Sequence, residues 1–560
     1  MNGYSVERRR RLTHRALPAL AALAVVAMAA GTMVGAMTMS PAERVASDFG
    51  AAWERGDHRA MYALLDDASR RAHSLRSFRR AYRDAAGTAT ATEVETADPE
   101  SDGSGTVIVP TVVRTRVFGI LRSELRLPVS GERVTWGPLL AFPGLRRGEG
   151  LSRSSEPPER ATLLSRNRRV LAEGPVDARG SPLEAIAGSI AGVLAPEETA
   201  QERRALYTRG FPPDWPVGQN GLEQAFEDRL AGVPGGRLLA GERVLAAARP
   251  RPAPPVRTTI DTRLQSAAVT ALAGRFGGVA ALDPRNGEIR ALAGIAFSAP
   301  QPPGSTFKIV TTTAVLEAGL VEPSTEFPVE TAAIIDGVEL ENANGEACGG
   351  TFRQSFAHSC NSVFAPLGVE VGAERLVDAA ERYGWNADPV VRGEVSSTLP
   401  PAGEIRTPLE VGSTAIGQFR TLATPLMLAS VAQTVASLGV RHVPTLTPGQ
   451  PEDGVRVTSR RVARTLERFM VDVVDYGTGT AAAVPGVKVA GKTGTAELED
   501  TRGPNADQTA ASDPSNTDAW FTAYAPARRP RIAVAVMLVR AGAGGATAAP
   551  AARVVLEAGL

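Results

Sequence analysis

The sequence feature that most constrains the fold is an unbroken apolar run near the C-terminus, from Ile532 to Leu538. A strand with one face in water alternates polar and apolar residues, so such a run predicts a strand covered on both faces. Helices are expected before and after it in the chain, over 261–272 and 548–558. Further strands are expected over 278–284, 288–292, 487–490 and 519–524. The C-terminal block is therefore predicted to hold an antiparallel sheet between helical layers.

The N-terminus carries the pattern of a membrane segment. Arg8 to Arg11 precede an uncharged stretch from Ala16 to Met39, and about 20 apolar residues span a bilayer as a helix. The arginines place the N-terminus in the cytoplasm and the rest of the chain outside. A cleaved signal peptide ending at Ala27-Met28-Ala29 is the alternative, but the stretch is long for a signal core. Residues 1–40 are expected to form a cytoplasmic tail and a retained transmembrane anchor, which predicts a single-pass protein of the cell membrane.

Three extracytoplasmic blocks are expected after the anchor. Over 41–148 a helical pattern is followed by strand-like runs, which predicts a small α+β domain. Because this block shows no cluster of His, Cys or paired carboxylates, a spacer or interaction role is favoured over a second enzyme. Over 149–255 short strands alternate with turns and one helical region near 222–230, and a stiff Pro-rich linker ends the block. Residues 256–560 form the last and largest block, so the chain is predicted to be a multidomain α+β protein.

Lysine is scarce in this chain, and its placement is informative. Lys and Arg together number 61, yet the only lysines are Lys308, Lys488 and Lys492. Arginine stays protonated, whereas a desolvated lysine can lose its proton and act as a base. Codon bias explains the scarcity but not the fact that Lys308 and Lys492 both lie in short motifs, so an amine is expected to be needed there. The net charge of +1 shows no basic excess of the kind that binds nucleic acid.

The first motif is Ser305-x-x-Lys308, which follows Gly304 and opens an apolar run. This start predicts a helix, and a spacing of three puts both side chains on one face of its first turn. Serine is a poor nucleophile unless a base lies within hydrogen-bonding reach. The amine of Lys308 is the candidate base, and the helix N-terminus would aim backbone N–H groups at developing negative charge.

Two more motifs follow in the same block. Ser359-Cys360-Asn361 offers a hydroxyl that can relay a proton and an amide that can donate to and accept from a peptide-like substrate. Alone, this triplet also fits a helix cap. Lys492-Thr493-Gly494-Thr495 is predicted to end a strand that starts at Val487. It supplies a positive charge, two hydroxyls and a glycine that lets the backbone approach a ligand closely.

The three motifs in this order resemble the signature of the penicillin-binding proteins. The block 256–560 is similar to the class B members, the monofunctional membrane-anchored transpeptidases of the bacterial cell wall. The similar segments are 261–265, 281–284, 287–289, 304–308, 417–418, 423–425, 477–479 and 490–496. The block 149–255 resembles the family's pedestal (dimerisation) domain, although Ala161 replaces a glycine and Ser165 an aspartate. The block 41–148 resembles the nuclear-transport-factor-like domain of a subset of the family, and no segment resembles a glycosyltransferase domain.

The resemblance implies a serine β-lactamase/transpeptidase-like domain that transfers the acyl group of the D-Ala-D-Ala end of peptidoglycan stem peptides. Ser305 would attack the penultimate carbonyl, with neutral Lys308 as its base. Burial and the charge of Lys492 would lower the pKa of Lys308. Ser359 would carry a proton toward the leaving amine. An amine from a neighbouring peptide would then resolve the acyl-enzyme and make the cross-link.

The resemblance implies binding roles for the other motif residues. Asn361 would hold the substrate's amide, while Thr493, beside Gly494, and Thr495 would bind its terminal carboxylate. The backbone N–H groups of Ser305 and Thr495 would form an oxyanion hole. β-Lactam antibiotics mimic the peptide terminus and would acylate the same serine. The reaction needs no metal or organic cofactor, and the partner that the resemblance implies is a polytopic peptidoglycan glycosyltransferase.

Two alternatives remain for the same residues. A D,D-carboxypeptidase or a class D β-lactamase would hydrolyse the acyl-enzyme instead of passing it to an amine. Class D enzymes share Ser-Thr-Phe-Lys but carry Ser-x-Val where this chain has Ser359-Cys360-Asn361, and they are far shorter. The second alternative is a non-catalytic β-lactam sensor or a scaffold of the division machinery, against which the complete set of motif residues argues.

The only two cysteines, Cys348 and Cys360, lie in the block placed outside the membrane, where disulfides persist. A bridge would tie the loop at Cys348 to the turn of the second motif and would stabilise the fold by roughly 3 kcal/mol. The alternative is that Cys360 is a small buried apolar residue and Cys348 is unpaired. The sequence leaves both open, because a bridge requires a Cα separation of roughly 4.4–6.8 Å.

Overall fold

The computed structural model describes residues 39–449, 453–498 and 513–560. The predicted tail and membrane anchor, residues 1–40, lie outside these residues except for Met39 and Ser40. No helix within the described ranges is long and apolar enough to cross a membrane. The chain divides into two compact units. The first comprises residues up to 158, 196–215 and 232–252, and the second comprises 159–195, 216–231 and 253–560. The block 149–255 therefore contributes to both units.

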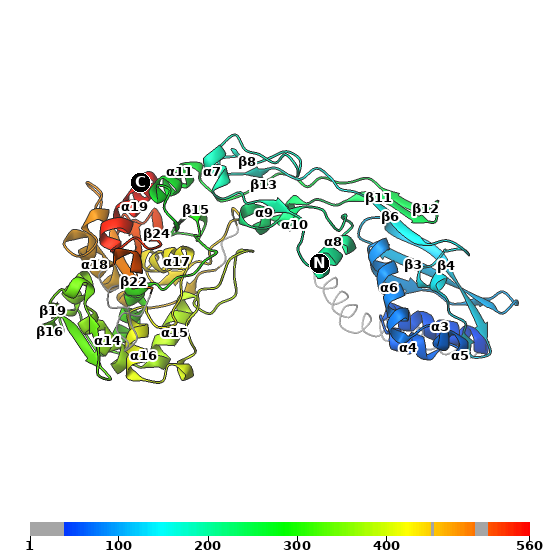
Figure 1. Ribbon diagram of the computed structural model, residues 1–560, viewed down its shortest axis with the longest axis horizontal. Coiled ribbons are helices and arrows are strands. Elements are labelled where there is room, and N and C mark those ends of the chain that lie inside the picture. Colours follow the sequence, from blue (N-terminus) through cyan, green and yellow to red (C-terminus); the bar gives the residue numbers. More distant parts are fainter. Residues whose placement is uncertain (1–38, 450–452, 499–512) are drawn as a thin grey trace, which may run out of the picture. The chain divides into compact units, whose positions relative to one another are not determined.

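The first unit begins with helices and a sheet (Figure 1). The helices are α3 (Pro41–Glu54), α4 (His58–Ala63), α5 (Asp67–Ala72) and α6 (Leu75–Ala89). The antiparallel sheet has the order β1 (Ala91–Thr96), β3 (Thr106–Thr115), β4 (Gly119–Ser130), β5 (Arg133–Val134), and β2 (Glu100–Ser101) pairs with β3. Ser40 starts α3 with a capping box, in which its hydroxyl accepts from the N–H of Glu43 and the Glu43 carboxylate accepts from the N–H of Ser40.

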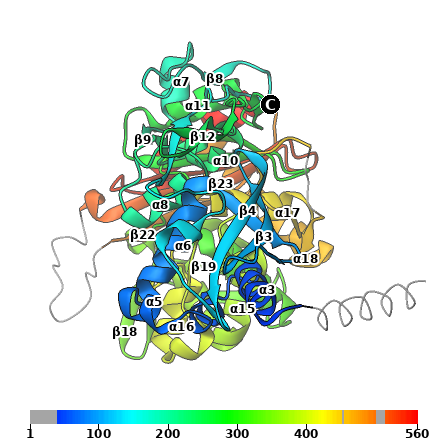
Figure 2. The same ribbon diagram turned by 90° about the vertical axis from the view of Figure 1, so that its right-hand side faces the viewer.

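One face of this sheet packs on the helices. Strands β3 and β4 alternate buried and exposed residues, and their buried Val107 and Leu127 share a core with Phe49 of α3 and Phe78 of α6. The long strands lie beside α3 in both views (Figure 1 and Figure 2). A half-buried sheet of this kind needs one covering layer only, which the helices provide.

The first unit also holds a second sheet, built from short strands of the kind predicted over 149–255, and a helix that the sequence did not predict. The sheet has the order β12 (Arg243–Ala248), β11 (Gly235–Ala240), β6 (Leu151–Glu156). The prediction of one helical region in 149–255 was wrong, because α7 (Glu184–Gly188) and α8 (Ala200–Thr208) occur besides α9 (Gly221–Ala225) and α10 (Glu227–Leu230). Leu206 is the buried residue of α8, so the helix has no apolar stripe from which periodicity could have found it.

The second unit is built on one antiparallel sheet. Its strand order is β15 (Ile289–Gly294), β14 (Gly277–Leu282), β24 (Ile532–Leu538), β23 (Thr517–Ala525), β22 (Ala490–Glu497). All four neighbouring pairs are antiparallel. Every residue of β24 is buried, which confirms the prediction of a strand covered on both faces.

Helices cover the two faces of this sheet. On one face Val534 and Val536 pack in a core with residues of α11 (Thr262–Leu272) and α19 (Gly544–Gly559). On the other face Ala535 and Met537 belong to the core that contains α17 (Pro425–Ala436) and α18 (Arg460–Asp475). The protein is thus a multidomain α+β protein whose C-terminal sheet lies between helical layers (Figure 1).

A helical region with two small sheets adjoins α17 and α18. Its helices are α12 (Lys308–Glu317), α13 (Phe352–His358), α14 (Asn361–Val371), α15 (Ala373–Tyr383) and α16 (Pro408–Ala415). Its two-stranded sheets pair β16 (Glu326–Glu330) with β19 (Cys348–Thr351) and β17 (Ala332–Ile335) with β18 (Val338–Glu341). Residues Lys308 to Leu316 of α12 are all buried, so this helix is a central element and its first residue is inside the protein.

The remaining short strands of the second unit form three small sheets. They pair β7 (Leu163–Leu164) with β8 (Val170–Ala172) and β13 (Val256–Arg257), β9 (Leu194–Ala195) with β10 (Val217–Gly218), and β20 (Val440–Arg441) with β21 (Val455–Arg456). Ser165, which stands where the resembling family has aspartate, closes the turn after β7, because its hydroxyl accepts from the N–H of Arg169 at 3.0 Å.

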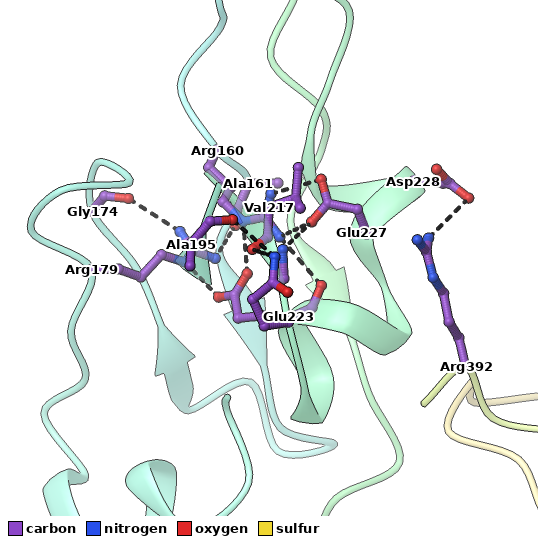
Figure 3. A network of polar contacts seen from close by, with 12 residues as sticks. Arg160, Ala161, Gly174, Arg179, Ala195, Val217, Glu223, Glu227, Asp228 and Arg392 are labelled. Atoms are coloured by element: carbon purple, nitrogen blue, oxygen red, sulfur yellow. Dashed lines mark hydrogen bonds and ion pairs between the residues drawn. The ribbon is translucent and has the colours of Figure 1, made fainter. Parts of the chain in front are cut away.

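A buried ion network holds this part of the second unit together (Figure 3). Arg160 donates to Glu223 at 2.7 Å and to Glu227 at 2.7 Å, and Arg179 donates to the second carboxylate oxygen of Glu223 at 2.5 Å. The four side chains are between 2% and 8% exposed. Two guanidinium groups thus balance two carboxylates, which is the condition for keeping such charges away from water.

Candidate active site

Ser305 and Lys308 lie where a 3₁₀ turn over Gly304–Phe307 continues into α12. The predicted helix start is therefore present, with its first turn tightened. Ser305 is partly exposed and Lys308 is fully buried. Within the described chain the Ser305 hydroxyl makes no hydrogen bond, so it is free to meet a ligand. Hydrogen bonds between a nucleophile and its base often tighten only when substrate is present.

The amine of Lys308 reaches from α12 to the second motif. Its Nζ lies 2.6 Å from the Ser359 carbonyl oxygen, 2.6 Å from Asn361 Oδ1 and 3.3 Å from Ser359 Oγ. The first two atoms can only accept, so they take two N–H bonds. The third is a hydroxyl, which can donate its proton to a nitrogen lone pair. These contacts therefore suit a neutral amine as well as an ammonium.

Lys492 joins the same cluster from β22. Its Nζ donates to Ser359 Oγ at 2.8 Å and to the Thr493 carbonyl at 3.1 Å. Ser359 Oγ therefore lies between two lysine amines. A hydroxyl in this position can accept from one amine while donating to the other, so it links their protonation states.

Burial lowers the pKa of both lysines, and the charge of Lys492 adds to the effect on Lys308. Burial, followed by the charge of Lys492, lowers the pKa of Lys308 well below its ordinary value. Burial lowers the pKa of Lys492 to about 7. Lys492 can therefore exchange a proton near neutral pH, and the neutral form of Lys308 is favoured, which is not the case for an exposed lysine or for any arginine. Lys488 differs, since its amine pairs with Asp475 at 2.7 Å and its side chain is 67% exposed.

Backbone geometry at the second motif explains how these groups converge. Ser359 ends α13 with φ 64°, in the left-handed region, and Asn361 is the first residue of α14. A serine in this conformation is uncommon and costs energy, so the surrounding structure must hold it there. The amide of Asn361 is occupied at both ends, since Oδ1 accepts from Lys308 and Nδ2 donates to the Glu341 carbonyl at 2.6 Å.

The third motif lies within its strand and not at its end. The prediction of a strand from Val487 that ends at the motif was wrong, because β22 runs from Ala490 to Glu497. Val487 makes only an isolated bridge to Val484. The motif is instead paired along its whole length with β23. Strand β22 is at the edge of the sheet, so alternate backbone groups point away from β23.

Two glycines allow the turn of the first motif to approach this strand. Gly304 has φ 53°, and a Cβ there would lie 2.7 Å from the Thr495 carbonyl oxygen. A Cβ at Gly494 would lie 2.8 Å from the Pro303 carbonyl oxygen and 2.9 Å from the Thr306 side chain. Both contacts are closer than a side chain tolerates, so glycine is required for β22 and the Ser305 turn to lie side by side.

Sequence reasoning did not assign Thr478 to the site, although it noted its Gly-Thr-Gly segment. The Thr478 hydroxyl lies 2.5 Å from the Thr493 hydroxyl. Thr495 Oγ1 accepts from the Gly544 N–H at the start of α19 at 3.2 Å. Thr478 thus joins Thr493 of the third motif, and only the fold brings these two hydroxyls together.

Cys348 and Cys360 form a disulfide, with a Cα separation of 5.8 Å. It joins β19 to the residue between Ser359 and Asn361. The bridge therefore fixes the backbone on which two site side chains depend. Both cysteines are buried.

Comparisons with known proteins identify the same region. Residues 277–557 match the model of the penicillin binding protein transpeptidase domain. The peptidoglycan D,D-transpeptidase PbpA of Mycolicibacterium smegmatis is 35% identical over 296 residues, which cover 47% of this chain and 56% of that protein. The matched part thus spans little more than half the length of this relative.

Solved structures are similar over a larger share of the chain. The crystal structure of PBPA from Mycobacterium tuberculosis has a TM-score of 0.56 and 26% identity, covering 72% of this chain and 99% of that one. The structure of Pseudomonas aeruginosa PBP2 has a TM-score of 0.61 and 25% identity, covering 72% and 96%. With the family model matching half of its residues, the chain belongs to the penicillin binding protein transpeptidase family.

Proposed function

We propose that the protein is a peptidoglycan D,D-transpeptidase that forms an acyl-enzyme on Ser305 and is acylated by β-lactams. The observation that carries the proposal is the convergence of three motifs distant in sequence. The amines of Lys308 and Lys492 both contact Ser359 Oγ, at 3.3 Å and 2.8 Å. The PBPA structure of M. tuberculosis in a penicillin G acyl-enzyme complex, 28% identical, supports the chemistry.

In the first half-reaction Ser305 attacks the carbonyl of the penultimate D-alanine. Neutral Lys308 takes the hydroxyl proton as the C–O bond forms. That proton then reaches the leaving D-alanine nitrogen through Ser359 as the C–N bond breaks. Lys308 suits this task because burial and the charge of Lys492 lower its pKa well below the ordinary value, which favours the neutral form that a base needs. When Lys492 is protonated, its charge favours the neutral form of Lys308.

Backbone N–H groups of Ser305 and Thr495 stabilise the oxyanion. In an antiparallel strand the N–H and C=O of one residue point to the same side. The Thr495 carbonyl points toward Gly304, as the 2.7 Å approach of a Cβ there requires, so its N–H also points away from β23. Loss of one such donor costs about 100–1,000-fold in rate.

The substrate binds along the edge of β22. Its terminal carboxylate accepts from the hydroxyls of Thr493 and Thr495, and Thr478 orients the Thr493 hydroxyl through their 2.5 Å contact. Asn361 Oδ1 accepts from Lys308, and its Nδ2 donates to the Glu341 carbonyl. The second lone pair of Oδ1 and the second N–H of Nδ2 remain to hold the substrate's amide. Gly494 keeps the strand free of a side chain at this point.

Residues outside the transpeptidase block place the enzyme at the membrane. Residues 1–40 are a cytoplasmic tail and transmembrane anchor, and 41–148 a nuclear-transport-factor-like domain. Residues 149–255 are the pedestal and linker, and 256–560 carry the site outside the cytoplasm. The anchor and pedestal contact a polytopic peptidoglycan glycosyltransferase, which supplies the glycan strands. No nucleic acid takes part.

Label lifetime and amine exchange separate this proposal from its alternatives. The full chain in detergent is incubated with a fluorescent penicillin and then with a D-Ala-D-Ala stem-peptide analogue and a free D-amino acid. A transpeptidase keeps the label for many minutes and exchanges the terminal residue of the analogue. Rapid loss of label with only hydrolysed peptide would identify a carboxypeptidase or β-lactamase. A stable label without exchange would identify a sensor or scaffold.

A further inference from the structure

Four arginines line one face of α6 in the first unit. Arg76, Arg79, Arg80 and Arg83 stand at spacings of three, four and seven, which puts them on the same side of a helix. Arg79 is partly exposed and the other three are exposed. The opposite side of the helix packs into the core through Phe78, Tyr82, Ala85 and Ala89. We call Arg76, Arg79, Arg80 and Arg83 the arginine face.

No carboxylate forms an ion pair with the arginine face within the part of the chain that the structure describes. None of its four side chains forms an ion pair there, whereas nearby Arg204 pairs with Asp84 at 2.5 Å. Like charges at these spacings on a helix repel one another. The pKa of half-buried His58 is lowered by burial and, to a smaller extent, by the charges of Arg79 and Arg83. The face is therefore suited to an anionic partner from outside the chain.

We propose that the arginine face docks on the anionic phospholipid surface of the membrane that holds this chain. The proposal rests on the proposed anchor, whose uncharged sequence ends at Met39, two residues before α3 begins at Pro41. Such a short connection keeps the first unit at the lipid surface. The Cα atoms of the four arginines span about 10 Å along the helix axis at 1.5 Å per residue. Each can bind a headgroup phosphate with two parallel hydrogen bonds.

Because the anchor holds the first unit near the membrane, a modest attraction is sufficient for docking. One arginine beside an anionic membrane surface gives about a fivefold preference for contact. Four such contacts multiply, and the anchor turns docking into an intramolecular step with a high effective concentration. Because the attraction is electrostatic, salt weakens it, and the Debye length falls to about 3 Å at 1 M.

Arginine footprinting of the full chain tests the proposal. The protein is inserted into nanodiscs of phosphatidylcholine alone or of phosphatidylcholine with phosphatidylglycerol. Each sample is treated briefly with 4-hydroxyphenylglyoxal, and the modification rate of every arginine is read by mass spectrometry. The internal control is an exposed quartet on α18, Arg460, Arg461, Arg464 and Arg468. Fluorescent penicillin labelling of the same samples reports separately on the active site.

The arginine face is expected to react at least fivefold more slowly in the anionic discs, in line with the preference of a single contact. The α18 quartet should react equally in both discs, and 1 M salt should remove the difference. Equal rates at the arginine face in the two discs would overturn the proposal even if penicillin labelling is intact. Protection that appears only on addition of teichoic acid would overturn it too, in favour of a cell-wall polymer.

A matched pair of variants sharpens the test. Arg79→Gln with Arg83→Gln removes two charges from the face, so Arg76 and Arg80 should lose most of their protection in anionic discs. Arg460→Gln with Arg464→Gln removes two charges with the same spacing on α18 and should leave that protection unchanged. If the two double variants behave alike, the arginine face is not a lipid-binding surface.

Discussion

Glu223→Gln should destabilise the second unit far more than a neighbouring exposed change. Glu223 accepts from Arg160 at 2.7 Å and from Arg179 at 2.5 Å, and its side chain is 2% exposed. Glutamine keeps the size but offers one oxygen, so its NH₂ group must face one guanidinium, donor against donor. Two arginines are then balanced by Glu227 alone. Breaking a buried ion pair in this way costs about 3–5 kcal/mol of unfolding free energy.

Asp228→Asn is the matched control, since Asp228 lies next to Glu227 but is 74% exposed and 3.7 Å from Arg392 (Figure 3). An exposed pair of this kind is worth about 0–1 kcal/mol. A double variant, Arg179→Gln with Glu223→Gln, restores one positive charge to one negative charge. The double variant should recover part of the lost unfolding free energy, because the single variant removes the charge balance of the cluster and the second change restores it.

Pulse proteolysis of the full chain across a urea series measures the effect, with fragments of the second unit followed by mass spectrometry. The unfolding midpoint should fall clearly for Glu223→Gln and barely for Asp228→Asn. Equal midpoints for these two variants would refute the view that the buried network is balanced by charge. So would a double variant that is as unstable as the sum of its single changes.

Three further predictions concern the site. Lys308→Arg should lower the rate of penicillin acylation by orders of magnitude, because arginine has no accessible neutral form. Lys492→Arg should lower this rate less, and Lys488→Arg should leave it unchanged. Equal losses of rate for the three variants in stopped-flow labelling would contradict these roles. The pKa of Lys492, about 7 in the folded protein and 10.5 ordinarily, means that the unfolded chain binds more protons between these values. The free energy of unfolding should therefore rise with pH from 7 to 10.5, by up to about 1.4 kcal/mol per pH unit. Lys492→Met should flatten this rise. If urea titrations of this variant give the same slope of unfolding free energy against pH as the unaltered chain, that result would argue against a buried lysine. A non-reduced digest of protein exported under oxidising conditions should yield one linked peptide containing Cys348 and Cys360, and two free thiols would contradict the bridge.

The central sheet was predictable because its signal is local. The short apolar run from Ile532 to Leu538 favours a strand with two covered faces, and the flanking helices α11 and α19 show clear apolar periodicity. The motif residues were found for a different reason. Their order along the chain matched a known family, and only the fold could show that Lys308, Ser359 and Lys492 meet.

The remaining features depend on tertiary contacts that no periodicity encodes. The start of β22 at Ala490 is set by pairing with Tyr524 of β23, not by the apolar residues that precede it. Helix α8 has too few buried residues to show a stripe. Thr478 enters the site because its turn is held by a bond from its N–H to the Ala357 carbonyl at 3.2 Å, a contact across more than one hundred residues of sequence.

The most direct test of the central claim is the location of the penicillin adduct. The full chain is treated with penicillin G, digested, and its peptides are sequenced by mass spectrometry beside the same digest of Ser305→Ala. We predict one acyl group on Ser305 in the unaltered chain, no adduct in the variant, and similar thermal stability for both proteins. An adduct on any other residue, or covalent labelling that survives Ser305→Ala, would contradict the assignment of Ser305 as the nucleophile.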